Sequence, residues 1–410
     1  MSDREFRLPL GRYLPPMGSA FVAIEALGGV VLLAATTVAL VWANVSLASY
    51  EQLWSTHLTV GAAEFALTET FRQWVNDGLM TVFFFVVGLE IKRELVRGEL
   101  RDPRTASLPV LAAIGGMAVP ALLYVAYNAG GVGSGGWGIP MATDIAFAVA
   151  LLAIVGSRVP SNLKLFLLTL AIVDDVGAIA VIVLFYSGSI SSTWLLGAAG
   201  ALTAIVILQR LRVPYALAYV LPAVLLWVCV LESGVHATIA GVALGLLTPA
   251  RPFGGREVIE PLEARLHPWS CLAIVPLFAL ANAGVFLGGG SIARAANSPI
   301  AWGIVLGLVV GKPLGIFATT VLALRLRLGR LPDGVRLVHV LAAGVAAGIG
   351  FTVSLFVANL AFGGSRLTAA KVAILIASVI SGILGVTLLR ATTARPTGAK
   401  TPVGGAPSGS

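Results

Sequence analysis

Charged residues are scarce in this chain. Only 11% of its 410 residues are Asp, Glu, Lys or Arg, whereas 58% are apolar. Soluble domains carry about 25% charged residues, so a water-soluble core cannot account for this much apolar surface. The composition excludes a sizeable soluble domain. Apolar segments of about 20 residues recur along the chain, which predicts an all-α protein that crosses a lipid bilayer many times.

Cysteine and catalytic motifs are also nearly absent. Cys229 and Cys271 fall inside apolar segments without a metal-type spacing, so we assign them only packing roles. An intramembrane hydrolase needs a Ser/His or metal-ligand constellation, and none is recognisable in the sequence. We therefore expect neither an enzyme nor a bound cofactor.

The net charge of +8 comes from basic residues in short loops between apolar segments. Such loops encode membrane topology, so we do not expect nucleic-acid binding. If the N-terminus is cytoplasmic, 22 of the 27 Lys and Arg residues fall on the cytoplasmic side and four on the other. This asymmetry predicts that both termini are cytoplasmic.

The apolar segments predict twelve transmembrane helices within a single integral membrane domain, residues 1–392. The tail 393–410 is rich in Gly, Pro, Ser and Thr, and we expect it to be disordered. The predicted spans are 20–43, 75–91, 105–126, 136–156, 161–186, 193–209, 214–231, 234–249, 267–287, 299–324, 336–361 and 368–390.

The longest outer loop lies between the first two spans. Residues His57–Thr70 alternate in a β-type pattern around Gly61, which predicts a small hairpin; an irregular loop is the alternative. An isolated hairpin is marginally stable in water, so pairing with a second subunit is plausible.

A weak internal repeat relates spans 3–5 to spans 10–12. Gly138–Thr143 in the fourth span resembles Gly348–Thr352 in the eleventh, and Pro120 has a counterpart in Pro313. Because span three starts inside and span ten outside, the two units would be inverted. Proline and glycine also predict that spans four and eleven are discontinuous, and such interruptions are tolerated only where they line a cavity or are buried in protein.

Four ionisable residues lie deep inside predicted spans: Asp144, Asp174, Asp175 and Lys312. Each costs about 2.5–3.5 kcal/mol at the centre of a membrane helix, so we expect them to cluster. A structural ion pair could explain one acid and one base, but three acids against one lysine leave an excess of carboxylate. This excess favours a functional site.

The chemistry of the cluster suits a hard cation. Carboxylates, the Thr143 hydroxyl and carbonyls of the interrupted spans supply oxygen ligands without sulfur or imidazole. The adjacent acids Asp174 and Asp175 resist joint ionisation and can retain protons. Cation and protons would then compete for the same oxygens, which gives antiport. Lys312 could carry a proton itself, release a carboxylate when the cation arrives, or be a purely structural counter-ion.

A second group of charges lies at the expected inner face, after span two and before span nine. It includes Glu90, Arg93, Glu94, Glu263 and His267. A solvated cluster that sets topology is the simpler interpretation. The alternative is an entrance funnel or pH sensor, in which His267 titrates nearest to neutral pH. Glu25, in the first span, is expected to pair within the bundle.

Five motifs together resemble the NhaA family of sodium/proton antiporters over nearly the whole chain. They are Phe85–Leu95 (FVVGLEIKREL), Ala142–Phe147 (ATDIAF), Val173–Ala178 (VDDVGA), Ala281–Gly284 (ANAG) and Gly311–Gly315 (GKPLG).

The resemblance implies electrogenic exchange of Na⁺ or Li⁺ for more than one proton, activated at alkaline pH, in the bacterial inner membrane. It implies that Asp175 is the principal Na⁺-binding and proton-carrying acid, and that Asp174 pairs with Lys312. Thr143 and Asp144 match the interrupted-helix positions, so Asp174, Asp175 and Thr143 are the expected ligands of the transported Na⁺.

The resemblance further implies that spans four and eleven cross, and that an outer hairpin near His57–Thr70 helps to hold a homodimer. We accordingly divide the domain into a core (103–186 and 298–392) and an interface region (20–91 and 193–287). A pH-response role is implied for Glu90, Arg93, Glu94, Glu263 and His267, and also for His236.

A cation channel and a proton-coupled symporter of an organic solute are the alternatives to antiport. A cation channel would favour repeated filter motifs, which the sequence does not show. A proton-coupled symporter of an organic solute would want more aromatic and amide groups in its spans. The central acids favour the antiporter.

Overall fold

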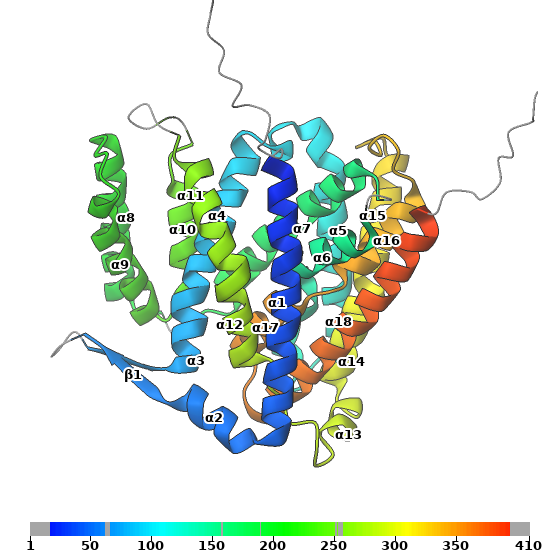
Figure 1. The fold of residues 1–410 in the computed structure, drawn as a ribbon, viewed down its shortest axis with the longest axis horizontal. Helices are drawn as coiled ribbons and strands as arrows, with labels where there is room; N and C mark the ends of the chain where they lie inside the picture. The colour runs from blue at the N-terminus through cyan, green and yellow to red at the C-terminus, as the bar shows by residue number, and fades with distance from the viewer. Residues whose placement is uncertain are drawn as a thin grey trace, which may run out of the picture.

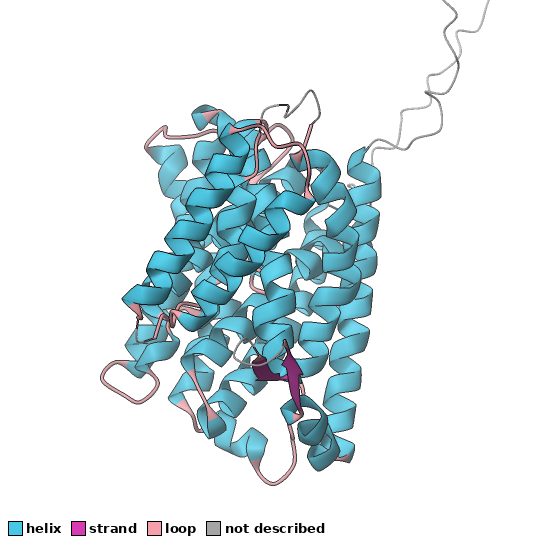
Figure 2. Cartoon of the chain, turned by 90° about the vertical axis from the view of Figure 1, so that its left-hand side faces the viewer, coloured by secondary structure: helices cyan, strands magenta, loops and turns pink. Residues whose placement is uncertain are grey.

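The computed structural model describes residues 17–61, 66–156, 159–188, 190–250, 252 and 257–393. The predicted disordered tail lies outside them apart from its first residue, Thr393, which is helical. The described chain is a bundle of tilted helices with a two-stranded sheet near one end (Figures 1 and 2). The start of α1 and the end of α18 lie toward the opposite end from this sheet (Figure 1).

The described residues of the first half of the chain are mainly helical, with the two-stranded sheet near their start. Its elements are α1 (Met17–Val45), α2 (Leu47–Ser55), β1 (His57–Val60), β2 (Leu67–Thr70), α3 (Phe71–Gln73), the π-helix η2 (Trp74–Leu79), α4 (Met80–Val96), η3 (Glu99–Arg101), α5 (Pro103–Asn128), η4 (Ser134–Gly136), η5 (Ile139–Met141), α6 (Ile145–Val155), α7 (Ser161–Phe185) and α8 (Ser192–Arg210).

The described residues of the second half contain several short helices, two further π-helical segments and the 30-residue helix α18. Its elements are α9 (Leu217–Glu232), α10 (Thr238–Leu247), α11 (Ile259–Trp269), the π-helix η7 (Ser270–Ile274), α12 (Val275–Asn282), α13 (Ser291–Ala296), α14 (Pro299–Leu306), the π-helix η8 (Gly307–Gly311), α15 (Lys312–Arg325), α16 (Leu337–Ala347), α17 (Phe351–Ala361) and α18 (Gly364–Thr393).

The structure supports a multi-pass membrane protein with fewer long spans than the sequence predicts. Within the described residues, eight helices are long and apolar enough to cross a membrane, or nine if α16 and α17 count as one bent span. Of the other predicted spans, α4, α9 and α10 have 17, 16 and 10 residues. Ten residues reach only about 15 Å, half of a bilayer core of about 30 Å, so α10 is shorter than the predicted span 234–249.

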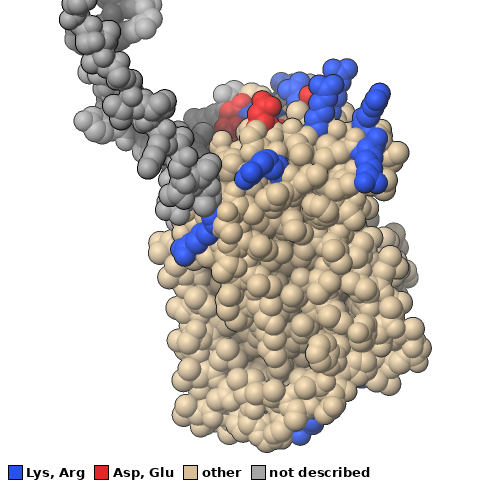
Figure 3. All heavy atoms as spheres, turned by 90° about the vertical axis from the view of Figure 1, so that its right-hand side faces the viewer, with Lys and Arg blue, Asp and Glu red and all other residues tan. Residues whose placement is uncertain are grey.

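Basic side chains gather at one end of the bundle. The face in Figure 3 shows Lys and Arg at the end where the described chain starts and finishes, a broad uncharged belt below, and little charge at the other end. The belt fits a surface that lies in lipid, and the uneven distribution agrees with the asymmetry of the sequence.

The predicted hairpin is confirmed as two antiparallel strands. His57 pairs with Thr70 and Val60 with Leu67. The Thr59 and Thr68 hydroxyls are 2.8 Å apart across the strands. At the base of the hairpin, Phe71 N donates to Thr56 O over 2.9 Å, which holds its two ends together.

Two of the π-helical segments precede prolines. Pro276 follows η7 and Pro313 follows η8. Because proline has no N–H to donate to the preceding turn, it favours such a local widening of the helix. Lys312 therefore begins α15 directly after a distorted turn, and its side chain is fully buried.

Glycines allow α4 and α10 to pack at very short distance. A Cβ atom built on Gly245 would lie 2.7 Å from the Gly88 Cα and from the Phe85 carbonyl oxygen. These are backbone atoms, so only separation of the helices could relieve the clash. Small residues at such contacts are the usual means of close helix packing in membranes.

We expect Gly245→Ala to lower the stability of the purified protein by about 1–3 kcal/mol, seen as a lower melting temperature in detergent. Gly200→Ala is the matched control, since Gly200 lies within α8 and a Cβ there meets nothing within 4 Å. Equal melting of the two variants would contradict the close α4–α10 contact.

Candidate ion-binding site

The first interruption lies between η5 and α6. Residues Ala142 and Thr143 are not helical, and Asp144 caps α6 by accepting a 3.1 Å hydrogen bond from Phe147 N. Pro140, within η5, cannot continue a regular ladder of backbone hydrogen bonds. The break thus falls where the sequence predicts it.

The second interruption separates α16 from α17, whose axes differ by 47°. Gly348, Ile349 and Gly350 form the connection. A Cβ on Gly348 would lie 2.6 Å from the Leu308 carbonyl oxygen of η8, so this close approach requires glycine.

Asp144 joins the two interruptions. Its Oδ2 accepts hydrogen bonds from Thr352 N at 2.9 Å and from Thr352 Oγ1 at 2.7 Å, at the start of α17. Its backbone N–H donates to Ile349 O over 2.7 Å. One carboxylate therefore caps α6 and also meets the first turn of α17, where the helix dipole favours negative charge.

Lys312 pairs with Asp174, the partner implied by the resemblance. Its Nζ lies 2.8 Å from Asp174 Oδ2, and both side chains are fully buried. Thr143 Oγ1 donates to the same oxygen over 2.6 Å, while Lys312 also donates to the Met141 carbonyl. The pair thus fastens α7 and α15 to the first interruption.

Asp175 lies beside this pair and faces a small cavity of about 40 Å³. Thr143, Asp144 and Thr352 also line the cavity. The Oδ1 atoms of Asp174 and Asp175 are buried and have no hydrogen-bond partner among the described residues. Buried polar atoms are usually satisfied, so these oxygens are suited to accept a proton, a water molecule or a cation.

Most of the second charge group also comes together, where α4 meets α11. Arg93 forms ion pairs with Glu263 and, at 3.3 Å, with Glu94. His267 Nε2 lies 3.9 Å from Glu90 Oε1 and 2.7 Å from Glu25 Oε1. Glu90 and His267 line the same cavity as Asp175.

His236 is placed differently. Its Nε2 lies 2.8 Å from the Tyr186 carbonyl oxygen, just after α7. Among the described residues, it makes no hydrogen bond or ion pair with the rest of the predicted pH group.

The sequence alone indicates no site role for three residues of this region. Thr352 gives no signal beyond its place in the internal repeat. Glu25 was expected only to pair in the bundle, and it does pair with His267. The sequence indicates only a packing role for Cys271, although its position four residues after His267 places both on one side of the helix.

Interrupted helices that meet around buried carboxylates in an apolar bundle define a class of polytopic ion-handling membrane proteins. Comparison with known proteins identifies the family within this class. A family model described as Na⁺/H⁺ antiporter 1 matches residues 19–389. The chain therefore belongs to the Na⁺/H⁺ antiporter 1 family, which confirms the resemblance found in the five motifs.

Several curated relatives cover nearly all of the chain. Na⁺/H⁺ antiporter NhaA 2 of Sorangium cellulosum is 45% identical over 93% of this chain and 91% of its own length. Na⁺/H⁺ antiporter NhaA of Rhodopirellula baltica is 44% identical over 97% and 100% of the two chains. Na⁺/H⁺ antiporter NhaA of Cronobacter sakazakii is 47% identical over 90% and 96%.

The Lys312–Asp174 pair makes a direct prediction about stability. Lys312→Met should destabilise the purified protein by about 3–5 kcal/mol, because it leaves a buried carboxylate without its cationic partner. Asp174→Asn combined with Lys312→Met should recover much of this loss. A double-mutant cycle of thermal unfolding in detergent measures the coupling, and strictly additive effects would contradict the pair.

Proposed function

We propose that this chain is an antiporter that exchanges cytoplasmic Na⁺ or Li⁺ for external protons, with Asp175 as the group that alternately binds the two. The observation that carries the proposal is the placement of Asp175. It faces a cavity at the meeting point of two interrupted helices, and its Oδ1 has no partner among the described residues.

The available ligands fit a hard cation. Besides Asp175, the Thr143 hydroxyl and the Asp144 carboxylate reach the cavity, and all of them are oxygen donors. A carboxylate must lose its proton before it can bind a cation. One site can therefore hold either Na⁺ or a proton, and this exclusion couples the two fluxes.

Binding of the cation can also displace Lys312 from Asp174. Thr143 Oγ1 and Lys312 Nζ both donate to Asp174 Oδ2. A Na⁺ ion that recruits Asp174 and Thr143 as ligands competes with Lys312 for that oxygen. Release of the ammonium group offers a second proton, so the exchange moves net charge and is electrogenic.

We further propose an architecture, a membrane location and a pH dependence for the whole molecule. Twelve spans, counting the shorter helices, form an inverted repeat in which spans four and eleven cross, divided into the core and interface regions defined above. The chain lies in the bacterial inner membrane with both termini cytoplasmic. Alkaline pH activates it through the group Glu90, Arg93, Glu94, Glu263, His267 and the separate His236.

The transport activity can be tested in acid-loaded everted membrane vesicles. Na⁺ and Li⁺ should dequench an acridine dye, and more strongly at alkaline than at neutral pH. Asp175→Asn should abolish this response, because an amide cannot exchange a proton for a cation. Asp102→Asn is the control: Asp102 caps α5 at the surface, and asparagine caps a helix equally well. Full exchange by Asp175→Asn would show that another group is the carrier.

We also propose that the hairpin β1–β2 contributes to a homodimer, since the side chains of β1 are exposed and the strand has an open edge. Because Thr56 and Phe71 are hydrogen-bonded at its base, residues 57–70 can be replaced by a two-glycine link. The shortened protein should be monomeric in native mass measurements, whereas the full chain should be dimeric. A dimer that survives the replacement would place the interface elsewhere.

A further inference from the structure

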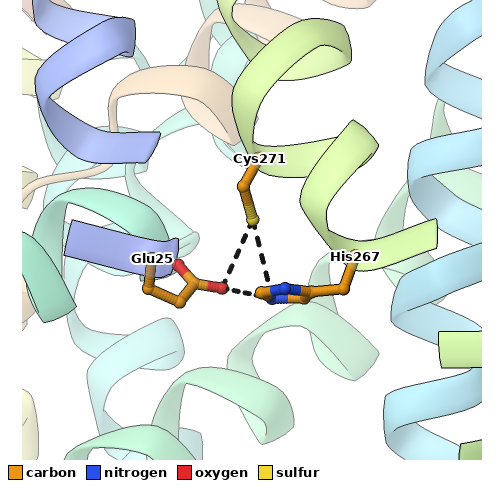
Figure 4. A group of neighbouring side chains, drawn as sticks. All are labelled: Glu25, His267 and Cys271. Atoms are coloured by element: carbon orange, nitrogen blue, oxygen red, sulfur yellow. Dashed lines mark hydrogen bonds and ion pairs between the residues drawn. The ribbon is translucent and has the colours of Figure 1, made fainter. Parts of the chain in front are cut away.

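Glu25, His267 and Cys271 meet inside the bundle and point toward one another (Figure 4). Glu25 comes from α1, His267 from α11 and Cys271 from η7. Each of the three side chains is more than nine-tenths buried. None of them belongs to the Lys312–Asp174 pair, and the proposed exchange at Asp175 does not use the thiol.

The distances among the three donor atoms are close to those of a zinc site. Cys271 Sγ lies 3.5 Å from Glu25 Oε1 and 3.5 Å from His267 Nε2, and the latter two atoms are 2.7 Å apart. Tetrahedral zinc with bonds of about 2.3 Å to sulfur and 2.0–2.2 Å to nitrogen and oxygen separates sulfur from the other ligands by about 3.5 Å. It separates nitrogen from oxygen by about 3.3 Å, so only the Glu25–His267 contact has to open, by about 0.6 Å.

The surroundings leave room for a fourth ligand. Glu25 Oε2 is buried and has no hydrogen-bond partner in the described part of the chain. Glu90 Oε1 lies 3.9 Å from His267 Nε2. Both acids and the other two donors line the same cavity as Asp175, so all four groups border one shared space.

We propose that Glu25, His267 and Cys271 bind a borderline-soft divalent cation, Zn²⁺, with Glu90 or water in the fourth position. The ligand types separate this site from the Na⁺ site. Thiolate and imidazole favour zinc over sodium, whereas the groups around Asp175 are all oxygen donors. His267 and Cys271 also stand four residues apart on one helix, a spacing that brings both donors to one ion.

Bound zinc has a predictable consequence for transport. A divalent ion at this point occupies the cavity that Asp175 also lines, so it should oppose Na⁺ binding there by occupancy and by charge. This consequence rests on the proposed antiport, whereas the binding of zinc does not.

Metal binding is tested first, on the purified full-length protein in detergent with Zn²⁺ alone and with Co²⁺ as a spectroscopic probe. Wild-type protein should show the near-ultraviolet charge-transfer absorption of a thiolate–Co²⁺ bond, and Zn²⁺ should remove it. Cys271→Ala should lose the absorption. Since outer-shell changes alone alter metal affinity by about 10–100-fold, loss of this ligand should weaken zinc binding by more than about tenfold.

Cys229→Ala is the matched control, because Cys229 is the other cysteine and packs with the separate apolar cluster of α8 and α9. It should keep both the absorption and the zinc affinity. Melting curves without metal establish that each variant is folded, and Cys271→Ser provides a second substitution. Equal zinc affinity in wild type and Cys271→Ala, or no thiolate–Co²⁺ absorption in the wild type, would overturn the site.

Transport is tested second, with each variant compared with its own zinc-free rate in vesicles. Zn²⁺ should inhibit the wild type and Cys229→Ala, and Cys271→Ala should need more than about tenfold more zinc for the same inhibition. Inhibition that is the same in all three would refute the block. A chain that binds zinc but exchanges no Na⁺ would refute the proposed antiport and leave the metal site standing.

Discussion

A buried ammonium–carboxylate pair holds the centre of this bundle together. Lys312 Nζ and Asp174 Oδ2 are 2.8 Å apart with no exposure to solvent. Either charge alone in an apolar bundle costs several kcal/mol, so each requires the other. Their further hydrogen bonds to Thr143 and Met141 fix the first interruption against α7 and α15. The position of the neighbouring carboxylate of Asp175 therefore depends on this pair.

Asp144 links the two helix interruptions through its hydrogen bonds. Broken backbone inside a membrane exposes N–H groups that lipid cannot satisfy. Asp144 accepts hydrogen bonds from Phe147 N and Thr352 N. A single side chain therefore satisfies one backbone N–H in the first turn of α6 and one in the first turn of α17. Donors hold Asp144 and one oxygen of Asp174, so Asp175 is the remaining central acid. Within the described residues its Oδ1 has no hydrogen-bond partner and is suited to accept a proton or a cation.

The sequence predicted that the four deep ionisable residues would cluster, because buried charge in an apolar segment is a strong signal. The free-energy cost of a charged side chain in a membrane helix is enough to single out Asp144, Asp174, Asp175 and Lys312. Prolines and glycines indicate the positions of both helix interruptions. The hairpin followed from its alternating pattern. The short length of α10 was missed, because hydropathy measures apolar content and does not show where a helix ends.

Contacts between distant segments could not be predicted in the same way. Glu25 and His267 are separated by 242 positions, so no local pattern joins them. The sequence around Thr352 does not show that its hydroxyl donates a hydrogen bond to Asp144. His236 was grouped with the pH-response residues by resemblance, whereas the structure places it against the Tyr186 carbonyl.

In the proposed exchange, Na⁺ and protons compete for Asp175. Proton release on addition of Na⁺ to the purified protein in weakly buffered detergent solution tests that claim most directly. The wild-type protein should acidify the solution when Na⁺ is added, and the Asp175→Asn protein should not. Equal proton release from both proteins would contradict the assignment of Asp175 as the site of exchange.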